Sequence, residues 1–506
     1  MKILLTTLNS KYIHSNLALK YLFAVCHEMR EKISLREFTI NNEDDYILGE
    51  LLRGEYGVIC FSCYIWNIER ILNLSDTVRK ARPDTKIVLG GPEVTHRAIE
   101  ILSKYRSVDF ILTGEGEYNF PKLLDVILNR NAGRSLDEIR GLVYRRDTKI
   151  CVNPSSFEVD FRQVPFPYHT LISEADKIIY YESSRGCPYN CSYCLSSIDK
   201  GIRSLPVERV KQDLSYFIHK KAEQVKFVDR TFNYDIERAC EIFSYLINID
   251  NGITNFHFEL CGELMDEVMF GILQTARPGL FQFEIGVQST NPKTLNAINR
   301  KADFAKLSEN VERLKKIGSF HLHLDLIAGL PYEDYNSFRQ SFNDVYKLLP
   351  DQLQLGFLKL LPGTAIRDNA DEHSYIYRDN APYEVISNKY ISADGLVRLK
   401  MVENILNLYY NRGGFNKTLK FATEELWDES FDFYEEFANF YYLKGFHHKS
   451  HKKEDLYRIF RLYGWWKDRS VPGTGIKTEQ LLFHDMNLTL NPETVKKFES
   501  KGWEIR

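Results

Sequence analysis

The sequence has no excess of basic residues. Its 66 Lys and Arg are balanced by 69 Asp and Glu, giving a net charge of −3, so overall charge does not predict a nucleic-acid-binding protein. No apolar run reaches the roughly eighteen residues of a membrane span, and the apolar start turns polar at Thr6, too early for a signal peptide. We therefore expect a cytoplasmic protein with no membrane or nucleic-acid partner.

Cysteine is scarce, with nine residues in a chain of 506. An odd, irregularly spaced set is a poor disulfide framework and fits a reducing compartment. The sequence also lacks an internal repeat, and its one biased segment is the His- and Lys-rich run 447–453, expected to be an exposed loop. A composition of 44% hydrophobic and 27% charged residues is that of a globular protein, long enough for about three domains.

The first 130 residues alternate apolar β-branched runs with helical patterns. The strand candidates are 2–8, 33–40, 56–63, 86–91 and 110–114, and an amphipathic helix is expected over 67–81. This alternation predicts a doubly wound parallel sheet over 1–130, with any ligand at the carboxyl ends of the strands. In 131–177 the periodicity fades, which indicates a linker with a hairpin.

Alternation resumes over 178–361. The strand candidates are 178–183, 225–229, 256–260, 281–288, 321–329 and 352–360. Each of the first five is followed by a helical pattern, so we expect a partial (βα)6 relative of the TIM barrel with its chemistry at the strand ends. The remainder, 362–506, is rich in aromatic residues and predicts a mainly α domain, a helical core or a lid over the barrel, of unknown role.

Three cysteines stand together directly after the first barrel strand. Cys187, Cys191 and Cys194 have the spacing CxxxCxxC, which suits an iron–sulfur cube whose fourth iron stays open. A structural zinc site is the alternative, and it would need a fourth ligand recruited through space, such as His219 or Cys240.

Residues 178–361 resemble the radical S-adenosylmethionine (SAM) superfamily, whose signature is this spacing with an aromatic residue, here Tyr193, before the last cysteine. The resemblance implies that the three cysteines hold a 4Fe-4S cluster and that SAM chelates the open iron, with Tyr193 contributing to its site. It also implies reductive cleavage of SAM to methionine and a 5′-deoxyadenosyl radical. An electron donor such as flavodoxin or ferredoxin would then be a partner.

Further positions look like SAM contacts of the same superfamily. The resemblance assigns this role to Glu284 and Gln288 on the fourth strand, to Asp229 at the end of the second, and to Gly329 after the fifth. Each of these positions also has a structural interpretation. Glu284 suits a salt bridge inside the barrel, the segment of Asp229 suits helix capping by Asn233 or Asp235, and Gly329 suits a simple turn.

The catalytic residues are otherwise unknown from the sequence. Glu259, Cys261 and Glu263 cluster near the end of the third barrel strand. Because that end faces the mouth of the predicted barrel, these three are the candidates for the substrate site.

The N-terminal domain resembles the cobalamin-binding domain of methionine synthase and mutases, whose pattern is DxHxxG, SxL and GG. Ser62 with Tyr64 stands for SxL, and Gly90 with Gly91 stands for GG. By this resemblance Ser62, Gly90 and Gly91 would contact the cofactor. The DxHxxG element is absent, and His14 nearby is expected to be a polar loop residue.

Residues 1–361 together resemble the cobalamin-binding radical SAM enzymes. The resemblance implies an enzyme that cleaves SAM at a 4Fe-4S cluster and, with cobalamin seated between the two domains, methylates an unactivated carbon of an unknown substrate. Ring rearrangement or cyclisation is the other outcome in this class. Two further hypotheses stay open: a radical SAM enzyme whose first domain binds no cobalamin, and a non-catalytic iron–sulfur or zinc protein.

Overall fold

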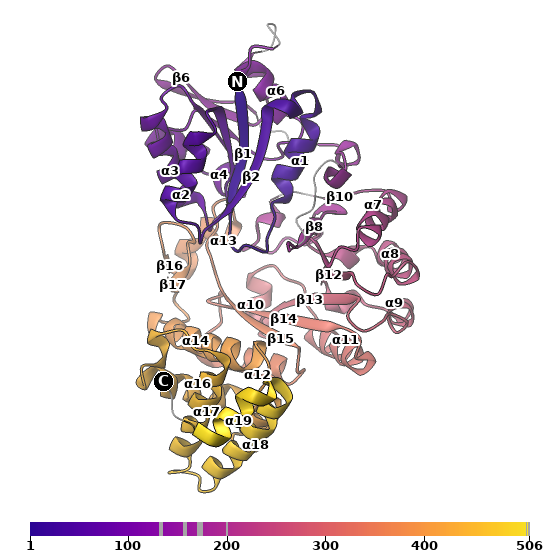
Figure 1. Cartoon of the computed structure of the whole chain (residues 1–506), viewed down its shortest axis with the longest axis vertical. Helices are drawn as coiled ribbons and strands as arrows, with labels where there is room; N and C mark the ends of the chain where they lie inside the picture. The colour runs from indigo at the N-terminus through magenta and orange to yellow at the C-terminus, as the bar shows by residue number, and fades with distance from the viewer. Residues whose placement is uncertain (131–134, 155–158, 170–175, 199–200, 502, 504–506) are drawn as a thin grey trace. The chain divides into compact units, whose positions relative to one another are not determined.

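The computed structural model describes residues 1–130, 135–154, 159–169, 176–198, 201–501 and 503. The chain folds as two compact units, whose elements are labelled in Figure 1. The first unit is Met1–Gln282 with Lys359–Asn369 and Arg378–Glu384, and the second is Phe283–Leu358 with Ala370–Tyr377 and Val385–Arg506.

The first sheet has the predicted doubly wound arrangement. Its five parallel strands are β1 (Lys2–Asn9), β2 (Ile33–Thr39), β3 (Tyr56–Ser62), β4 (Lys86–Gly90) and β5 (Phe110–Leu112), in the order β2-β1-β3-β4-β5. This is the flavodoxin-like order, which places a ligand-binding crevice at the carboxyl ends of the strands.

The expected hairpin in 131–177 is present and extends this sheet. Strands β6 (Leu142–Arg146) and β7 (Lys149–Val152) add to β5 in antiparallel fashion, so the sheet reaches beyond residue 130. Within the segment predicted as a linker, 131–134, 155–158 and 170–175 lie outside the described residues.

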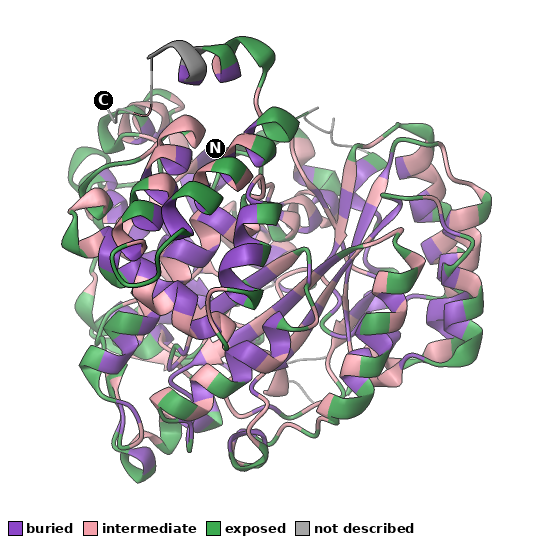
Figure 2. Cartoon of the chain, turned by 90° about the horizontal axis from the view of Figure 1, so that it is seen from below, coloured by how far each residue is buried: buried purple, intermediate pink, exposed green. Residues whose placement is uncertain are grey.

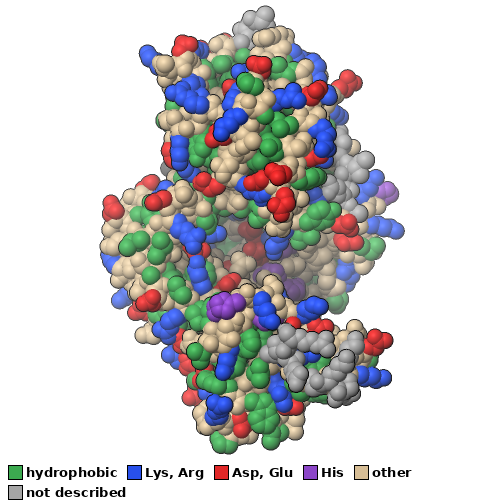
Figure 3. All heavy atoms as spheres, turned by 60° about the vertical axis from the view of Figure 1, so that its left-hand side comes forward, with side chains coloured by type: hydrophobic (Ala, Val, Ile, Leu, Met, Phe, Trp, Pro, Cys, Tyr) green, Lys and Arg blue, Asp and Glu red, His purple; other side chains and the backbone are tan. Residues whose placement is uncertain are grey.

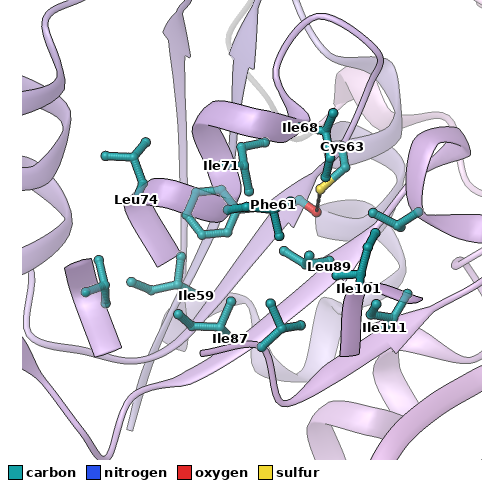
Figure 4. Packing of buried hydrophobic residues seen from close by; sticks show 14 of the residues in the cluster. Ile59, Phe61, Cys63, Ile68, Ile71, Leu74, Ile87, Leu89, Ile101 and Ile111 are labelled. Atoms are coloured by element: carbon teal, nitrogen blue, oxygen red, sulfur yellow. Dashed lines mark hydrogen bonds between the residues drawn. The ribbon is translucent and has the colours of Figure 1, made fainter. Parts of the chain in front are cut away.

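Helices cover both faces of the sheet: α1 (Leu17–Val25), α2 (Asp44–Arg53), α3 (Ile68–Ala81), α4 (Pro92–Thr95), α5 (Ala98–Lys104) and α6 (Phe120–Ile127). Strand side chains alternate between two buried clusters. Figure 4 shows one of them, where Ile59 and Phe61 of β3 pack with Ile71 of α3, whereas Cys60 belongs to the other. Burial on both faces explains the nearly continuous apolar runs of these strands.

The first unit continues into three parallel βα repeats. Their strands are β8 (Ile179–Tyr181), β11 (Gln224–Phe227) and β12 (Asn255–Leu260), and their helices are α7 (Val207–His219), α8 (Ile236–Asn248) and α9 (Glu267–Leu273). A hairpin that the sequence did not predict, β9 (Ser184–Gly186) with β10 (Ile202–Ser204), follows β8. A short helix, α13 (Ala365–Asp368), also belongs to this unit.

The other three repeats belong to the second unit, apart from the first two residues of their first strand, which belong to the first unit. Their strands are β13 (Phe281–Gln288), β14 (His321–Ala328) and β15 (Gln352–Phe357), with helices α10 (Pro292–Ala297), α11 (Phe304–Ile317) and α12 (Tyr335–Tyr346). The chain therefore has the six strands of the predicted partial barrel. The alternating burial of β13 and β14 contrasts with the uniformly buried β1.

The C-terminal domain is mainly helical, as expected. Its helices are α14 (Ala393–Ile405), α15 (Asn416–Glu424), α16 (Ser430–Leu443), α17 (Lys453–Lys467), α18 (Thr474–Thr489) and α19 (Pro492–Lys501). A small hairpin, β16 (Ile376–Tyr377) with β17 (Val385–Ser387), precedes them; strands this short leave no pattern in the sequence. No helix in the described part of the chain is long and apolar enough to cross a membrane.

Burial follows the expected layering. In Figure 2 the strands are largely buried, and the helices turn exposed residues outward. Figure 3 shows basic and acidic side chains intermingled on the visible face, in keeping with the balanced composition.

Aromatic rings form the core of the C-terminal domain. Phe437 on α16 is fully buried, and its ring centroid lies 4.6 Å from that of Tyr463, 4.8 Å from Tyr409 and 4.9 Å from Phe460. The aromatic run that the sequence displayed is thus a packed core, in which each ring contacts several others.

We expect Phe437→Ala to destabilise this domain by about 3 to 5 kcal/mol, because it removes a fully buried ring and leaves a cavity. Thermal unfolding should show a lower transition temperature. Leu443→Ala on the same helix is the control, since Leu443 is 77% exposed. Equal transition temperatures for the two variants would contradict this role.

Candidate functional site

The three cysteines lie on one loop, residues 187–194, that leaves β9; we call it the thiol loop. It begins at Gly186, which has φ +98° and where a Cβ would lie 2.1 Å from the Gly201 carbonyl oxygen. No other residue fits there without a backbone shift. The loop closes with a turn in which the Cys194 amide donates to the Cys191 carbonyl at 3.1 Å.

The donor set fits an iron–sulfur cluster. Within the described residues none of the three cysteines forms a disulfide; Cys191 is buried, and Cys187 and Cys194 are half-buried. Next to Cys191, the Ser192 hydroxyl is buried and has no hydrogen-bond partner among the described residues. A hydroxyl donor beside three thiols suits the hydrogen bonds that tune cluster sulfurs. Assignment of the three cysteines to a 4Fe-4S cluster, and of Tyr193 to SAM, stays a prediction.

A site for a single metal ion has different requirements. In the described part of the chain, no three His, Cys, Asp or Glu side chains are grouped so that they could hold one metal ion. A mononuclear zinc centre needs such a group, whereas in an iron–sulfur cube each thiolate binds a different iron. This finding bears on the zinc alternative and does not test the cluster.

A thiol–carboxylate pair stands just beyond β12. The Cys261 thiol donates to Glu263 Oε2 at 3.1 Å and accepts from the Tyr189 hydroxyl at 3.2 Å. The Asn233 side chain accepts from the Cys261 amide and donates to its carbonyl, both at 2.8 Å. Tyr189 belongs to the thiol loop, so the structure joins two of the three predicted substrate-site residues to that loop. The third, Glu259, lies half-buried on β12.

Asp229 follows β11 and is 1% exposed. Its carboxylate accepts from the Ser183 amide at 2.9 Å and from the Ser183 and Ser184 hydroxyls at 2.6 Å each. Burial raises the pKa of this carboxyl group, and those hydrogen bonds oppose the rise. Asp229 thus anchors the strand that enters the thiol loop, while Asp235 caps α8. Contact of Asp229 with SAM stays a prediction.

In the second unit, β13 presents the predicted polar face. Glu284, Gly286 and Gln288 are half-buried and alternate with buried apolar residues. The carbonyl of Gly286 accepts from the Arg300 guanidinium. Gln288 has φ +72°, and Gly329 beyond β14 has φ +91°, so the backbone turns sharply at both predicted SAM contacts. Their roles remain predictions.

A cavity of about 670 Å³ opens at the carboxyl ends of β1, β3 and β4, a volume typical of small-molecule sites. The predicted cobalamin contacts Ser62, Gly90 and Gly91 all line it. So do Leu195 and Ile198, directly after the thiol loop. The residues predicted for cobalamin thus share one hollow with the exit of the thiol loop, within a single compact unit.

The two glycines serve different purposes. Gly91 has φ +110°, and a Cβ there would lie 2.5 Å from the Cys63 carbonyl oxygen, so the backbone itself requires glycine. At Gly90 a Cβ would meet only the Leu112 carbonyl oxygen, at 3.6 Å. A larger side chain at Gly90 would therefore occupy the cavity, and glycine keeps that space open.

Aromatic side chains form part of the cavity wall. Tyr64, which stands where the SxL pattern has Leu, stacks on Trp66 with ring centroids 4.6 Å apart. The Asn16 amide, whose oxygen caps α1, lies 3.5 Å from the Ser62 hydroxyl and 3.4 Å from the Tyr64 hydroxyl. The loop after β1 and the end of β3 are thereby held together.

His14 also lines this cavity, which its sequence context did not indicate. Its Nδ1 lies 2.6 Å from the Tyr180 hydroxyl. Burial lowers the pKa of this imidazole, and Lys11 lowers it further. Both effects favour the neutral form of the ring, and the tyrosine hydroxyl orients it.

A buried ion-pair network that the sequence did not predict lies between the cavity and the thiol loop. The Arg185 guanidinium lies 2.8 Å from Glu117, 2.8 Å from Glu182 and 3.3 Å from Glu115. Arg203 pairs with Glu115 as well. The acidic pattern around Glu115 and Glu117 was visible in the sequence, but their partner lies 68 residues beyond Glu117.

Three family models match successive parts of the chain. The model described as "B12 binding domain" matches residues 3–124, and "Radical SAM superfamily" matches 181–345. A family described as "Protein of unknown function (DUF4080)" matches 371–502. The matches fall on the doubly wound domain, the βα repeats and the helical domain.

Several curated proteins are similar over the first two regions. The cobalamin-dependent radical SAM methyltransferase TokK of Streptomyces tokunonensis is 26% identical over 58% of this chain and 45% of its own length. Hopanoid C-3 methylase of Methylococcus capsulatus is 24% identical over 58% of this chain and 57% of its own. Anaerobic magnesium-protoporphyrin IX monomethyl ester cyclase of Synechocystis is 24% identical over 62% and 64%. The chain thus spans less than two thirds of each relative.

Solved structures share the fold. The cobalamin-dependent SAM radical enzyme OxsB superposes with a TM-score of 0.65 at 14% identity, covering 100% of this chain and 84% of its own. The radical SAM methyltransferase TsrM of Kitasatospora setae does so with a TM-score of 0.61 at 15% identity, covering 76% of each chain. At this identity the likeness concerns the fold alone.

We expect Cys191→Ala to abolish most binding of iron and sulfide after anaerobic reconstitution, because it removes one of the three predicted thiolate ligands. Iron and acid-labile sulfide assays measure the loss. Cys240→Ala is the control, since Cys240 is buried on α8 away from the thiol loop in sequence. Full iron and sulfide content in the Cys191 variant would rule out its role as a ligand.

Proposed function

Since the chain is a radical SAM protein that carries a B12-binding domain, we propose that it cleaves SAM reductively and, with cobalamin, methylates an unactivated carbon of its substrate. One observation carries the proposal: the thiol loop and the cavity lined by Ser62, Gly90 and Gly91 belong to one compact unit, and residues directly after the loop line that cavity. A cofactor in the cavity would face the cluster.

When bound, a 4Fe-4S cluster supplies the electron that splits the sulfonium of SAM, and cobalamin supplies a methyl group. The side chains of the protein position these groups. Cys187, Cys191 and Cys194 would hold the cluster, and the buried network around Arg185 would keep the loop fixed against the cavity wall. An external one-electron donor, such as a flavodoxin or ferredoxin, would serve as the reductant.

The substrate would meet the thiol–carboxylate pair. Cys261 and Glu263 lie beyond a strand end of the barrel, the side on which such folds place their chemistry. Because the Cys261 thiol already donates to Glu263, the carboxylate is placed to accept a proton. We therefore assign the substrate-proximal role to this pair.

The proposal is tested by anaerobic incubation of the reconstituted protein with dithionite and SAM bearing a trideuterated methyl group. Mass spectrometry should detect 5′-deoxyadenosine from the wild type and none from Cys191→Ala. An extract of small metabolites serves as the substrate source. A product that is three mass units heavier with labelled SAM than with unlabelled SAM identifies methyl transfer. An unlabelled new product would favour ring rearrangement or cyclisation. Absence of 5′-deoxyadenosine from cluster-loaded wild type would refute the proposal.

Cobalamin binding predicts a specific sensitivity at Gly90. Gly90→Leu should lose most of the corrin retained after incubation with hydroxocobalamin and gel filtration, because the added side chain would fill cavity space. Visible absorbance of the eluted protein measures retention. Gly271→Leu on α9 is the matched control, since a Cβ there meets no atom within 4 Å. Equal retention by both variants would contradict a corrin in this cavity.

A further inference from the structure

In the second unit, the loops that follow β13 and β14 share a buried carboxyl group. Glu333 is 1% exposed. Its Oε1 accepts from the Ser289 hydroxyl at 2.5 Å and from the Ser341 hydroxyl at 3.1 Å. Ser289 belongs to the loop after β13, Glu333 to the loop after β14, and Ser341 to α12. One carboxyl group therefore joins three elements.

The same serines extend the network. The Thr290 amide donates to the Ser341 hydroxyl and the Asn291 amide donates to the Ser289 hydroxyl, each at 3.0 Å. The Asn291 side chain then donates to the Tyr332 carbonyl at 2.9 Å. The two loops are thus tied at several points, and loss of the central carboxyl contact would disturb all of them.

These loops begin at the two predicted SAM contacts, Gln288 and Gly329. Gln288 has φ +72°, which a residue other than glycine keeps only where the surrounding structure supports it, and Gly329 has φ +91°. The Gly329 carbonyl also accepts from the Tyr375 hydroxyl at 3.0 Å and from the Asn388 amide at 2.9 Å. The residue after Gln288 is Ser289, whose hydroxyl donates to the Glu333 carboxyl group.

The second carboxyl oxygen of Glu333 makes the charged form of this side chain costly. Oε2 is buried and has no hydrogen-bond partner among the described residues. Burial raises the pKa of Glu333 to about 7, the two serine hydroxyls oppose the rise, and Asp334 adds to it. The other titratable groups near the network are Asp344, which accepts from Thr290, and Tyr375.

Ionisation would leave a buried charge with an unpaired oxygen, which is costly. That cost would be relieved if the two loops separated and water reached the carboxylate. Separation would displace the backbone at Gln288 and Gly329. The proton on Glu333 therefore favours the closed arrangement of both loops.

We propose that Glu333 is a positioning residue that holds the two loops in the SAM-binding arrangement while it carries a proton, so that SAM affinity falls as the carboxyl group ionises. This inference rests on the proposed function, because it takes SAM as the ligand of these loops. Below the pKa of Glu333 the site is formed, and the affinity is lost as pH rises through that value.

The test is anaerobic titration calorimetry of SAM into the cluster-loaded protein from pH 6 to pH 8.5. For one group with a pKa near 7, the wild-type Kd should rise about tenfold between pH 6 and pH 8. Glu333→Gln keeps the shape and the acceptor oxygen but cannot ionise, so its Kd should stay close to the wild-type value at pH 6. Asp303→Asn, at the N-cap of α11, is the matched control and should keep the wild-type slope.

The outcomes separate this inference from the proposed function. A Glu333→Gln protein with the wild-type pH slope, or a wild type with no slope, overturns the inference and leaves SAM binding intact. No SAM binding by either cluster-loaded protein at any pH overturns the proposed function and the inference together. Thermal unfolding of Glu333→Gln at pH 6 should match wild type, and a large loss of stability there would overturn a positioning role.

Discussion

The arrangement of the thiol loop depends on one buried carboxylate. Asp229 accepts three hydrogen bonds from Ser183 and Ser184, and the next residues of the strand are Arg185, with its three carboxylate partners, and Gly186, where no Cβ fits. The protein's own contacts therefore hold the backbone in place where it enters the loop. Preorganisation of this kind is what a cluster with an open iron requires of its protein.

The same contacts couple the loop to the cavity. Glu115 and Glu117 follow β5 of the first sheet, and Arg185 precedes the first cysteine. Their side chains are at most 14% exposed, so removal of one partner would leave an uncompensated buried charge. Ion pairs as well as packing thus hold the thiol loop in a defined position relative to the cavity.

Helix α12 contacts both the C-terminal domain and a loop at the strand ends of the second unit. Ser341 on α12 contacts Glu333, while Tyr346 on the same helix lies 3.0 Å from the Tyr434 hydroxyl of α16. Arg339 also pairs with Asp432 at the start of α16. The C-terminal domain therefore packs onto α12, which supports the loops after β13 and β14. This packing suits a role of the domain in shaping these two loops.

The sequence alone predicted a doubly wound parallel sheet, six βα units, a mainly helical C-terminal region and the clustering of Cys187, Cys191 and Cys194. These follow from local periodicity and from spacing within a few residues, which a linear pattern records. The folded chain was needed to show that Cys261 contacts Tyr189, 72 residues away, and that Ser289 contacts Glu333, 44 residues away. The same holds for the addition of β6 and β7 to the first sheet, for the position of His14 in the cavity wall, and for the ion pair of Arg185 with Glu117. Such contacts depend on how whole strands and helices pack, so no local pattern in the chain specifies them.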